Sequence, residues 1–355
     1  MDAQAAQTYD RIVYPWDRPD GERVVPAPGD TIEVAPGVHW LRMPLPFALD
    51  HINLWLLDDG DGWTIVDTGY GVAATRKLWR RLFETRLGGR PVTRVIATHF
   101  HPDHMGSAAW LAGHWRAPFW TTQGEWLMAH LVHAGRGPTN PAARAAFYRE
   151  HGLDDERLAT MKGRGNTYRK GVPDLPGEYR RLRDGDAVEI GGHAWRIIVG
   201  TGHAPEHACL FADGLGVLIS GDQILPRITT NVSVWPGEPL ADPLADYIGS
   251  LDRFRPLPAG TLVLPSHDRP FTGLHARLDM LASHHDDRLA ELAGMLDGAP
   301  SAAALMPRLF RRPLDAHQTM FAMGETIAHL HYLIGRGEVA RERDGDEVWR
   351  FSRRR

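Results

Sequence analysis

Residues 98–106, with the sequence Thr-His-Phe-His-Pro-Asp-His-Met-Gly, constrain this chain more than any other segment. Three histidines and one aspartate fall within six positions, directly after the apolar run Val92–Ala97. If this run is a strand that ends in a loop, the residue between His99 and His101 points away, and both imidazoles can converge on one ion. Pro102 then turns the chain into a helix, whose first turn directs further ligands elsewhere, toward a second ion.

Asp103 and His104 are the ligand types in that first turn. Imidazole and carboxylate ligands suit zinc, with iron or manganese as alternatives. Such a cluster needs more ligands from distant sequence, and three later segments repeat one pattern, in which a strand is followed by a small residue and then by a ligand type. These segments are Thr201-Gly202-His203, Ser220-Gly221-Asp222 and Pro265-Ser266-His267. Because side chains at strand ends meet at one edge of a layered sheet, we expect them to join the first cluster.

The hydrophobic pattern predicts an α/β fold. Short apolar or alternating runs indicate strands at Thr31–Val34, Val38–Met43, Ile52–Leu57, Trp63–Asp67, Val92–Ala97, Ala187–Ile190, Trp195–Val199, Ala208–Ala212, Val217–Ser220 and Thr261–Leu264. Helical periodicity is found at residues 71–87, about 243–254 and about 274–296, and a further helix is expected to begin at Asp103. Residues 1 to about 30 are rich in Pro, Gly and Asp and predict an irregular arm.

Two segments interrupt this pattern. Residues 122–180 are helical, loop-rich and arginine-rich, and are interpreted as an insertion between strands. After Gly298-Ala299-Pro300, residues 301–355 predict helix, helix and two short strands, which is the outline of a small winged-helix unit. We therefore expect a catalytic domain at residues 1–297 and a winged-helix domain at residues 298–355.

Composition excludes several classes of protein. The only cysteine, Cys209, excludes an internal disulfide framework and a multi-cysteine metal site, and its apolar strand predicts an inert core residue. The sequence contains no run of 18 apolar residues, so no membrane span is expected. It also lacks the apolar segment of a secretory signal near its start, so a cytoplasmic protein is expected. The net charge of −4 gives no global argument for nucleic-acid binding.

These motifs resemble those of the metallo-β-lactamase superfamily over roughly residues 31–295, including the turn Val66-Asp67-Thr68-Gly69. The resemblance implies a four-layer αββα sandwich. It also implies a metal held by His99, His101 and His203, and a second metal held by Asp103, His104 and His267. In such sites Asp222 would bridge both metals, and Asp67 would support the ligands from behind. The tail resembles the winged-helix unit of one branch of the superfamily, which includes a lactamase-like endoribonuclease.

The resemblance implies a hydrolase that uses a metal-bridging hydroxide, with Asp103 or Asp222 holding the hydroxide and relaying its proton. True zinc β-lactamases generally lack the bridging aspartate, whereas glyoxalase II thioesterases and homoserine-lactone lactonases share all seven ligand types. A small acyl substrate with a thioester, lactone or ester bond is therefore expected. The alternative is an endoribonuclease or phosphodiesterase that uses the tail to hold nucleic acid. Against that alternative, residues 343–347 place acids where a phosphate-binding wing needs bases, so a dimer contact or a pocket wall is the favoured role of the tail.

The substrate pocket is less well defined by the sequence. Its walls are expected to come from the insertion and from the loop after Asp222, through Ile224, Leu225, Asn231, Val234 and Trp235, although the apolar members could equally pack in the core. Asn231, Trp235 and His207 are the candidates for substrate contact, with a structural role as the alternative for His207. The pair His284-His285 is expected to be a polar helix face.

Overall fold

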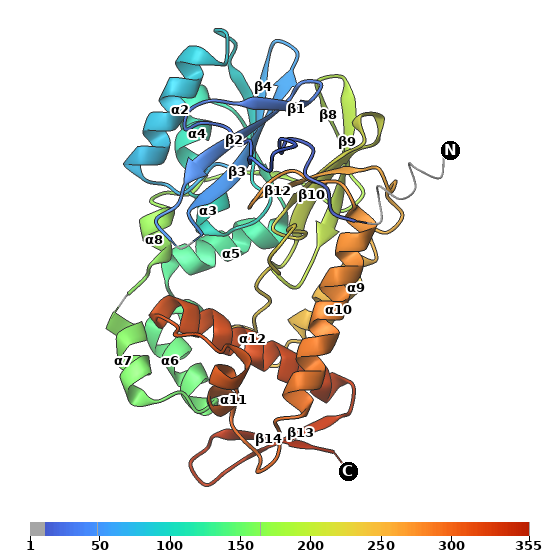
Figure 1. Ribbon diagram of the computed structural model, residues 1–355. Helices are drawn as coiled ribbons and strands as arrows, with labels where there is room; N and C mark the ends of the chain where they lie inside the picture. The colour runs from blue at the N-terminus through green and yellow to red at the C-terminus, as the bar shows by residue number, and fades with distance from the viewer. Residues whose placement is uncertain (1–10, 48, 164, 355) are drawn as a thin grey trace.

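The computed structural model describes residues 11–47, 49–163 and 165–354, and its upper part consists of two β-sheets packed face to face (Figure 1). The first sheet has seven strands in chain order: β1 (Ile32–Ala35), β2 (Val38–Pro44), β3 (His51–Asp59), β4 (Gly62–Val66), β5 (Val92–Ile96), β6 (Phe119–Thr121) and β7 (Arg180–Arg181). The second sheet has the order β12 (Leu262–Pro265), β11 (Val217–Gly221), β10 (His207–Ala212), β9 (His193–Gly200) and β8 (Ala187–Ile190).

Both sheets are mixed. Strands β1 to β4 pair antiparallel, and β4 to β7 pair parallel. In the second sheet only the β11–β12 pair is parallel. The space between the sheets is filled by aliphatic side chains and by three fully buried tryptophans, Trp40, Trp55 and Trp195. This shared apolar layer fixes the two sheets against each other, because each strand directs alternate side chains into it.

Helices cover the outer face of each sheet, which completes the expected αββα sandwich. The first sheet is covered by α2 (Ala73–Thr85), α3 (Pro102–Met105), α4 (Ala108–Trp115) and α5 (Gln123–Ala134). The second is covered by α9 (Pro243–Leu251) and α10 (Leu274–Ala293), and a short 3-10 helix, η2 (Asp213–Leu215), connects β10 to β11. The sequence missed β6 and β7, which have only three and two residues, and the single helix expected from Asp103 is divided near Gly106.

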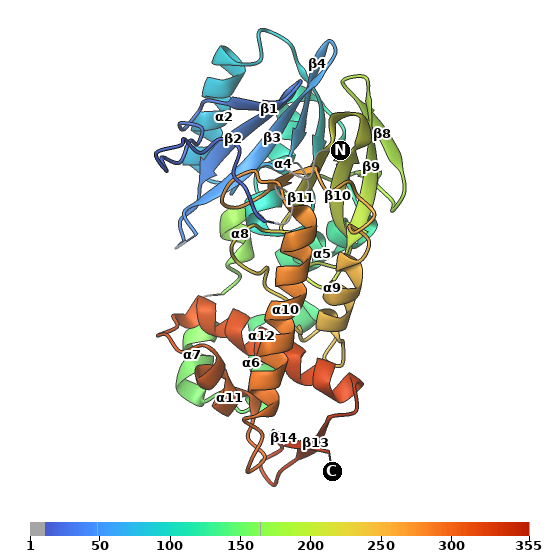
Figure 2. The same cartoon turned by 45° about the vertical axis from the view of Figure 1, so that its right-hand side comes forward.

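The insertion and the tail meet in a lower lobe (Figure 2). Of the expected insertion, α5 and α8 (Tyr168–Gly171) pack with the first sheet, and η1 (Gly137–Thr139), α6 (Pro141–Glu150) and α7 (Asp155–Gly163) lie in this lobe. The tail forms α11 (Ala302–Leu309), α12 (Ala316–Gly335), β13 (Val339–Arg343) and β14 (Trp349–Arg353), the expected order of two helices and two strands. Residues of α6 and α7 share one apolar core with α9, α10, α11 and α12. The Tyr148 hydroxyl donates to the Met320 carbonyl at 3.3 Å, so the insertion packs on the tail as well as on the sandwich.

One expectation about this region is wrong, and one open alternative is decided. His285 is buried at 1% exposure, where its Nδ1 lies 3.3 Å from His329 Nε2, because this side of α10 packs against α12 rather than facing solvent. Ile224, Leu225 and Val234 are buried, which is the core-packing alternative rather than the pocket wall, and Ile224 and Val234 belong to the apolar core shared by the second sheet and the lower lobe. Cys209 is buried in β10, as expected of an inert core residue.

Three buried histidines of this lobe predict a loss of stability in acid. Burial lowers the pKa of His285 to about 3 and that of His329 and His151 to about 4, from the ordinary value of 6.5. Between pH 6.5 and 4 these imidazoles are therefore protonated in the unfolded chain and neutral in the folded chain. Their contribution to the free energy of unfolding is complete above pH 6.5 and falls as the pH drops toward 4. Each histidine contributes at most about 1.4 kcal/mol per pH unit in this window. Urea unfolding between about pH 7 and pH 5 measures the effect.

The matched variant for this prediction is His329→Asn. The His329 Nδ1 donates to the Glu325 carbonyl at 2.8 Å, and an asparagine amide can replace that donor while removing the titrating ring. We expect its free energy of unfolding to depend less steeply on pH than that of the wild type. An unchanged slope would contradict the assignment.

None of the helices in the described part of the chain is long and apolar enough to cross a bilayer.

Candidate metal centre

All candidate ligands gather at one edge of the sandwich, where strands from both sheets end. His99 and His101 follow β5, and α3 begins at Pro102, so that Asp103 and His104 leave from its first turn. His203 follows β9, Asp222 follows β11 and His267 follows β12. The structure therefore brings together the seven residues that the sequence singled out from segments as far apart as β5 and β12.

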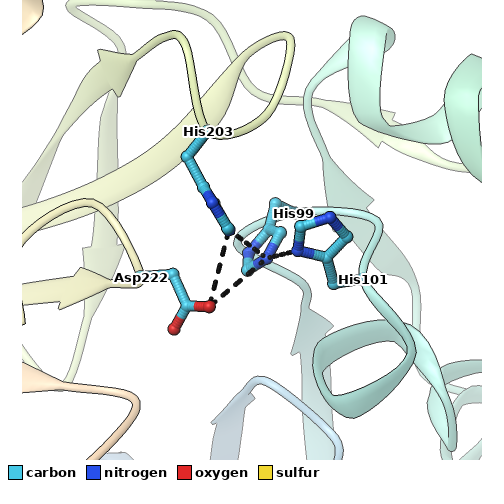
Figure 3. Close-up of side chains that lie close together, drawn as sticks. All are labelled: His99, His101, His203 and Asp222. Atoms are coloured by element: carbon cyan, nitrogen blue, oxygen red, sulfur yellow. Dashed lines mark hydrogen bonds and ion pairs between the residues drawn. The ribbon is translucent and has the colours of Figure 1, made fainter. Parts of the chain in front are cut away.

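The first group consists of His99, His101, His203 and Asp222 (Figure 3). His99 Nε2 lies 2.9 Å from His101 Nδ1 and 3.3 Å from His203 Nε2. Asp222 Oδ2 lies 3.5 Å from His203 Nε2 and 3.9 Å from His99 Nε2. Three imidazole nitrogens and a carboxylate oxygen thus converge on one point, which is the donor set that suits zinc.

The second group consists of Asp103, His104 and His267. His267 Nε2 lies 3.5 Å from Asp103 Oδ2, and His104 Nε2 lies 3.9 Å from the same oxygen. The other oxygen of Asp222, Oδ1, faces this group at 3.6 Å from His104 Nε2 and 3.4 Å from His267 Nε2. The two oxygens of Asp222 therefore face different groups, as a bridging carboxylate requires.

The ring orientations also fit metal binding. Three histidines use Nδ1 for a hydrogen bond behind the centre: His203 to the Asn231 carbonyl at 2.7 Å, His267 to the His51 carbonyl at 2.9 Å, and His104 to Asp67 Oδ2 at 2.8 Å. Such bonds fix the tautomer and leave Nε2 free as a ligand. Among the described residues, His104 Nε2 and Asp222 Oδ1 are buried without any hydrogen-bond partner, which is costly unless a cation satisfies them.

Asp67 lies behind the second group, where the resemblance placed it. Besides His104, its carboxylate accepts hydrogen bonds from the Thr98 backbone N–H at 2.8 Å and from the Thr98 hydroxyl at 3.0 Å. Its φ of 63° lies in the left-handed region, which costs energy for a residue with a side chain. The strained turn aims the carboxylate at both the metal-bearing loop and the His104 ring.

Burial and charge separate the protonation states in the centre. Burial lowers the pKa of His99 and of His101 well below the ordinary value, and neighbouring imidazoles lower it further, so both rings are neutral donors. Burial opposes the charge on Asp222, but His267 and His104 outweigh it and hold the Asp222 pKa well below its usual range. Burial also lowers the pKa of His104, yet Asp67 and Asp222 outweigh it and raise that pKa well above 6.5. Asp67 and Asp222 thus provide the negative charge that bound cations would balance in place of the proton on His104.

His207 does not meet the expectation of a substrate contact. Its side chain is fully buried, its ring lies 4.8 Å from that of His99, and the Asp222 backbone N–H donates to its Nε2 at 3.1 Å. Gly221, at φ +53°, makes this approach feasible, because a Cβ there would lie 2.4 Å from the imidazole. His207 thus supports Asp222 from behind, which was the structural alternative.

The other two substrate candidates remain partly accessible. Asn231 receives the His203 hydrogen bond on its carbonyl, and its amide donates to Glu325 Oε2 on α12 at 3.1 Å. Trp235 packs edge-on against Phe321 of α12, with ring centroids 6.5 Å apart. The tail therefore contacts the loop that supports a metal ligand.

Sequence reasoning missed Glu125, a fully buried carboxylate at the start of α5. Its oxygens accept hydrogen bonds from the Phe100 N–H at 2.9 Å and from the Glu206 N–H at 2.6 Å. Burial raises the pKa of Glu125 to about 7, although both N–H donors favour the charged form. Thr122-x-x-Glu125 has the spacing of a helix capping box, so the available signal predicted a local cap rather than a contact with the metal loops.

Comparisons with known structures cover almost the whole chain. A beta-lactamase domain protein from Burkholderia ambifaria is 46% identical, with a TM-score of 0.89, and the match covers 99% of this chain and 100% of that one. The metallo-beta-lactamase family protein TTHA1429 from Thermus thermophilus is 32% identical, with a TM-score of 0.75, over 91% of this chain and 100% of that one. The arrangement of the sandwich with its lower lobe is therefore shared with these proteins.

Curated relatives are more distant. The "Probable metallo-hydrolase YqjP" of Bacillus subtilis is 24% identical over 332 residues, which cover 87% of this chain and 96% of that protein. The human "Acyl-coenzyme A thioesterase MBLAC2" is 24% identical over 264 residues, which cover 70% of this chain and 84% of that protein. These similarities, together with the geometry of the two His/Asp clusters, indicate a metal-dependent hydrolase.

Two family models divide the chain between them. The model described as "Metallo-beta-lactamase superfamily" matches residues 48–267, and the model described as "Metallo-beta-lactamase-like, C-terminal domain" matches residues 289–354. The first match contains every candidate ligand, and the second covers α11 to β14. Because the first model alone matches more than half of the chain, the chain belongs to the metallo-beta-lactamase superfamily.

Proposed function

We propose that this protein is a dinuclear metal-dependent hydrolase that cleaves a thioester, lactone or ester bond of a small organic acyl substrate. The observation that carries the proposal is Asp222, whose two oxygens face two separate groups of ligand atoms. One carboxylate shared in this way supports a paired centre rather than two independent sites. Zinc is the metal that this donor set favours, with iron or manganese as alternatives.

Different residues of the chain have different roles in such a reaction. When bound, two divalent cations supply Lewis acidity and activate water at neutral pH. The histidines would hold the cations through ring nitrogens, and Nδ1 hydrogen bonds keep the rings of His104, His203 and His267 in place. The side chains of Asp103 and Asp222 keep 18% and 11% of their surface exposed, so either carboxylate can orient water and accept its proton.

Aromatic groups around the centre support an organic substrate. The Phe100 ring lies 4.5 Å from the His101 ring. The exposed Phe47 ring packs edge-on against Tyr70 at 5.4 Å, and Asp103 is close enough to raise the Tyr70 pKa, after the larger effect of burial. The human relative is named an acyl-coenzyme A thioesterase, which supports the thioester as the bond to test first.

The nucleic-acid alternative has less support. The arginines of the β13–β14 hairpin are engaged within the protein: Arg343 pairs with Glu150 and Glu347, and Arg350 pairs with Asp344. The last residue of the arginine-rich end, Arg355, lies outside the described residues. Contacts of α12 with Asn231 and Trp235 instead favour the tail as a wall of the site. A homodimer through the tail stays a prediction that analytical ultracentrifugation would test.

A hydrolysis screen of metal-loaded protein tests the proposed function. The panel contains acetyl- and octanoyl-coenzyme A, a homoserine lactone, an aryl ester, a phosphodiester and an RNA oligonucleotide. We expect turnover of a thioester, lactone or ester and none of RNA. Turnover confined to the phosphodiester or RNA would overturn the acyl assignment and favour the nuclease.

A further inference from the structure

The start of α5 lies between two of the loops that carry metal ligands. Glu125 accepts one hydrogen bond from Phe100, the residue between His99 and His101, and one from Glu206, three residues after His203. Asp222 also faces both loops, but it does so through their imidazoles, whereas Glu125 accepts from their backbone N–H groups. Because Glu125 is fully buried, water cannot replace either bond.

The capping arrangement around α5 explains why Glu125 is free for this role. The Gly124 N–H at the helix start donates to Glu206 Oε2 at 2.8 Å, and the Thr122 hydroxyl donates to the Glu206 carbonyl at 2.8 Å. A carboxylate from the His203 loop therefore caps the helix, and Glu125 reaches outward instead of back to Thr122. The Glu206 carboxylate accepts from the Gly124 N–H, and the Glu125 carboxylate accepts from the Glu206 N–H, so two hydrogen bonds join the helix start to the loop.

The Phe100 peptide is held on both of its sides. Its N–H donates to Glu125, and its carbonyl accepts from the Tyr168 hydroxyl of α8 at 2.6 Å. A Cβ on Gly171, at the end of α8, would lie 2.7 Å from Pro102, so the insertion packs tightly beside the His99–His101 loop. The insertion therefore fixes the backbone from which two ligands project.

We infer that Glu125 is a positioning residue, which holds the His99–His101 loop and the His203 loop at the separation that the first metal group requires. The inference rests on the dinuclear centre of the proposed function and is independent of the substrate. It predicts the larger effect on one cation, because the ligands of the second group come from α3 and from the loop after β12, whereas the two hydrogen bonds of Glu125 go to Phe100 and Glu206.

The test compares Glu125→Gln with Glu206→Gln. Each glutamine has the size of the glutamate and one carbonyl oxygen. At Glu206 that oxygen can still accept the single Gly124 N–H, and the backbone N–H still donates to Glu125. At Glu125, two N–H groups bond to two different oxygens, so the glutamine must turn its NH2 toward one of them.

Zinc titration against a chromophoric chelator, and the visible spectrum of the cobalt-substituted protein, provide readouts that need no substrate. We expect Glu125→Gln to keep one tight equivalent of metal and to bind the other roughly 10- to 100-fold more weakly, with an altered cobalt spectrum for that site only. Glu206→Gln is expected to bind both as the wild type does. Wild-type binding in Glu125→Gln, equal weakening in both variants, or loss of both equivalents together would each overturn the inference.

A second measurement covers the case in which Glu125→Gln does not fold. Hydrogen exchange of the metal-free wild-type protein is expected to show protected amides at Phe100 and Glu206, because Glu125 holds them without help from a cation. Free exchange at both amides would overturn the inference. The metal content of the wild type tests the proposed function separately. If the wild type binds fewer than two equivalents, the dinuclear centre is wrong, whatever the role of Glu125.

Discussion

Replacing Asp222 by alanine is expected to abolish hydrolysis, with a loss in kcat of at least about 10³-fold, equivalent to roughly 4 kcal/mol. The reason is geometric: one side chain faces His99 and His203 with Oδ2 and faces His104 and His267 with Oδ1. Its removal takes a ligand atom from both groups and the shared charge from between them. Initial rates on the best substrate of the acyl panel measure the effect.

The fold of Asp222→Ala should remain intact, because the hydrogen bond to His207 comes from the backbone N–H of residue 222 and survives the substitution. Circular dichroism provides that check. Asp286→Asn, on the exposed side of α10, removes one carboxylate far along the chain from every ligand and serves as the matched control with wild-type turnover. Turnover of Asp222→Ala within a few-fold of the control would show that Asp222 is not shared between cations.

Chelation is expected to eliminate activity and to lower the melting temperature, and both should return with two equivalents of divalent metal per chain. Binding to the folded state alone stabilises it by RT ln(1 + [M]/Kd), about 4 kcal/mol at a free metal concentration 1,000 times Kd. The metal-free centre is left with mutually close imidazoles and with buried polar atoms that lack partners in the described structure, namely His104 Nε2 and Asp222 Oδ1. Calorimetry and elemental analysis on the same samples measure the two effects.

Asp222→Ala provides the control for this experiment, since a protein with a damaged centre should lose less stability to the chelator than the wild type does. Identical melting of the wild type with and without chelator, together with no bound metal by elemental analysis, would contradict the assignment of the clusters as metal sites. Recovery at one equivalent rather than two would contradict a paired centre.

The metal centre was predictable because its signal is local. His99, His101, Asp103 and His104 lie within six positions of one another. The more distant ligands, His203, Asp222 and His267, each follow a strand and a small residue. Short apolar runs similarly located both sheets, because strands such as β4, β10 and β11 are buried along their whole length and their residues are apolar in sequence. The two strands that escaped prediction, β6 and β7, are too short for any period to show.

What the sequence concealed depends on distant partners. In sequence, His284 and His285 of α10 resemble a polar helix face, but in the structure α12 covers His285. Glu125 satisfies a capping pattern in sequence, yet it bonds elsewhere because Glu206 caps the helix in its place. The role of the insertion as a packing partner of the tail leaves no local trace, because its contacts, such as Tyr148 with Met320, are separated by 172 positions.

That separation has a consequence for biosynthesis. Helices α6 and α7 leave the ribosome before α11 and α12 are synthesised. The apolar surface around Tyr148 therefore stays exposed to solvent until these two helices emerge and pack against it. Chains terminated prematurely would present this surface permanently. The nascent protein should therefore depend on chaperones most strongly between the synthesis of its middle third and the release of its last residues.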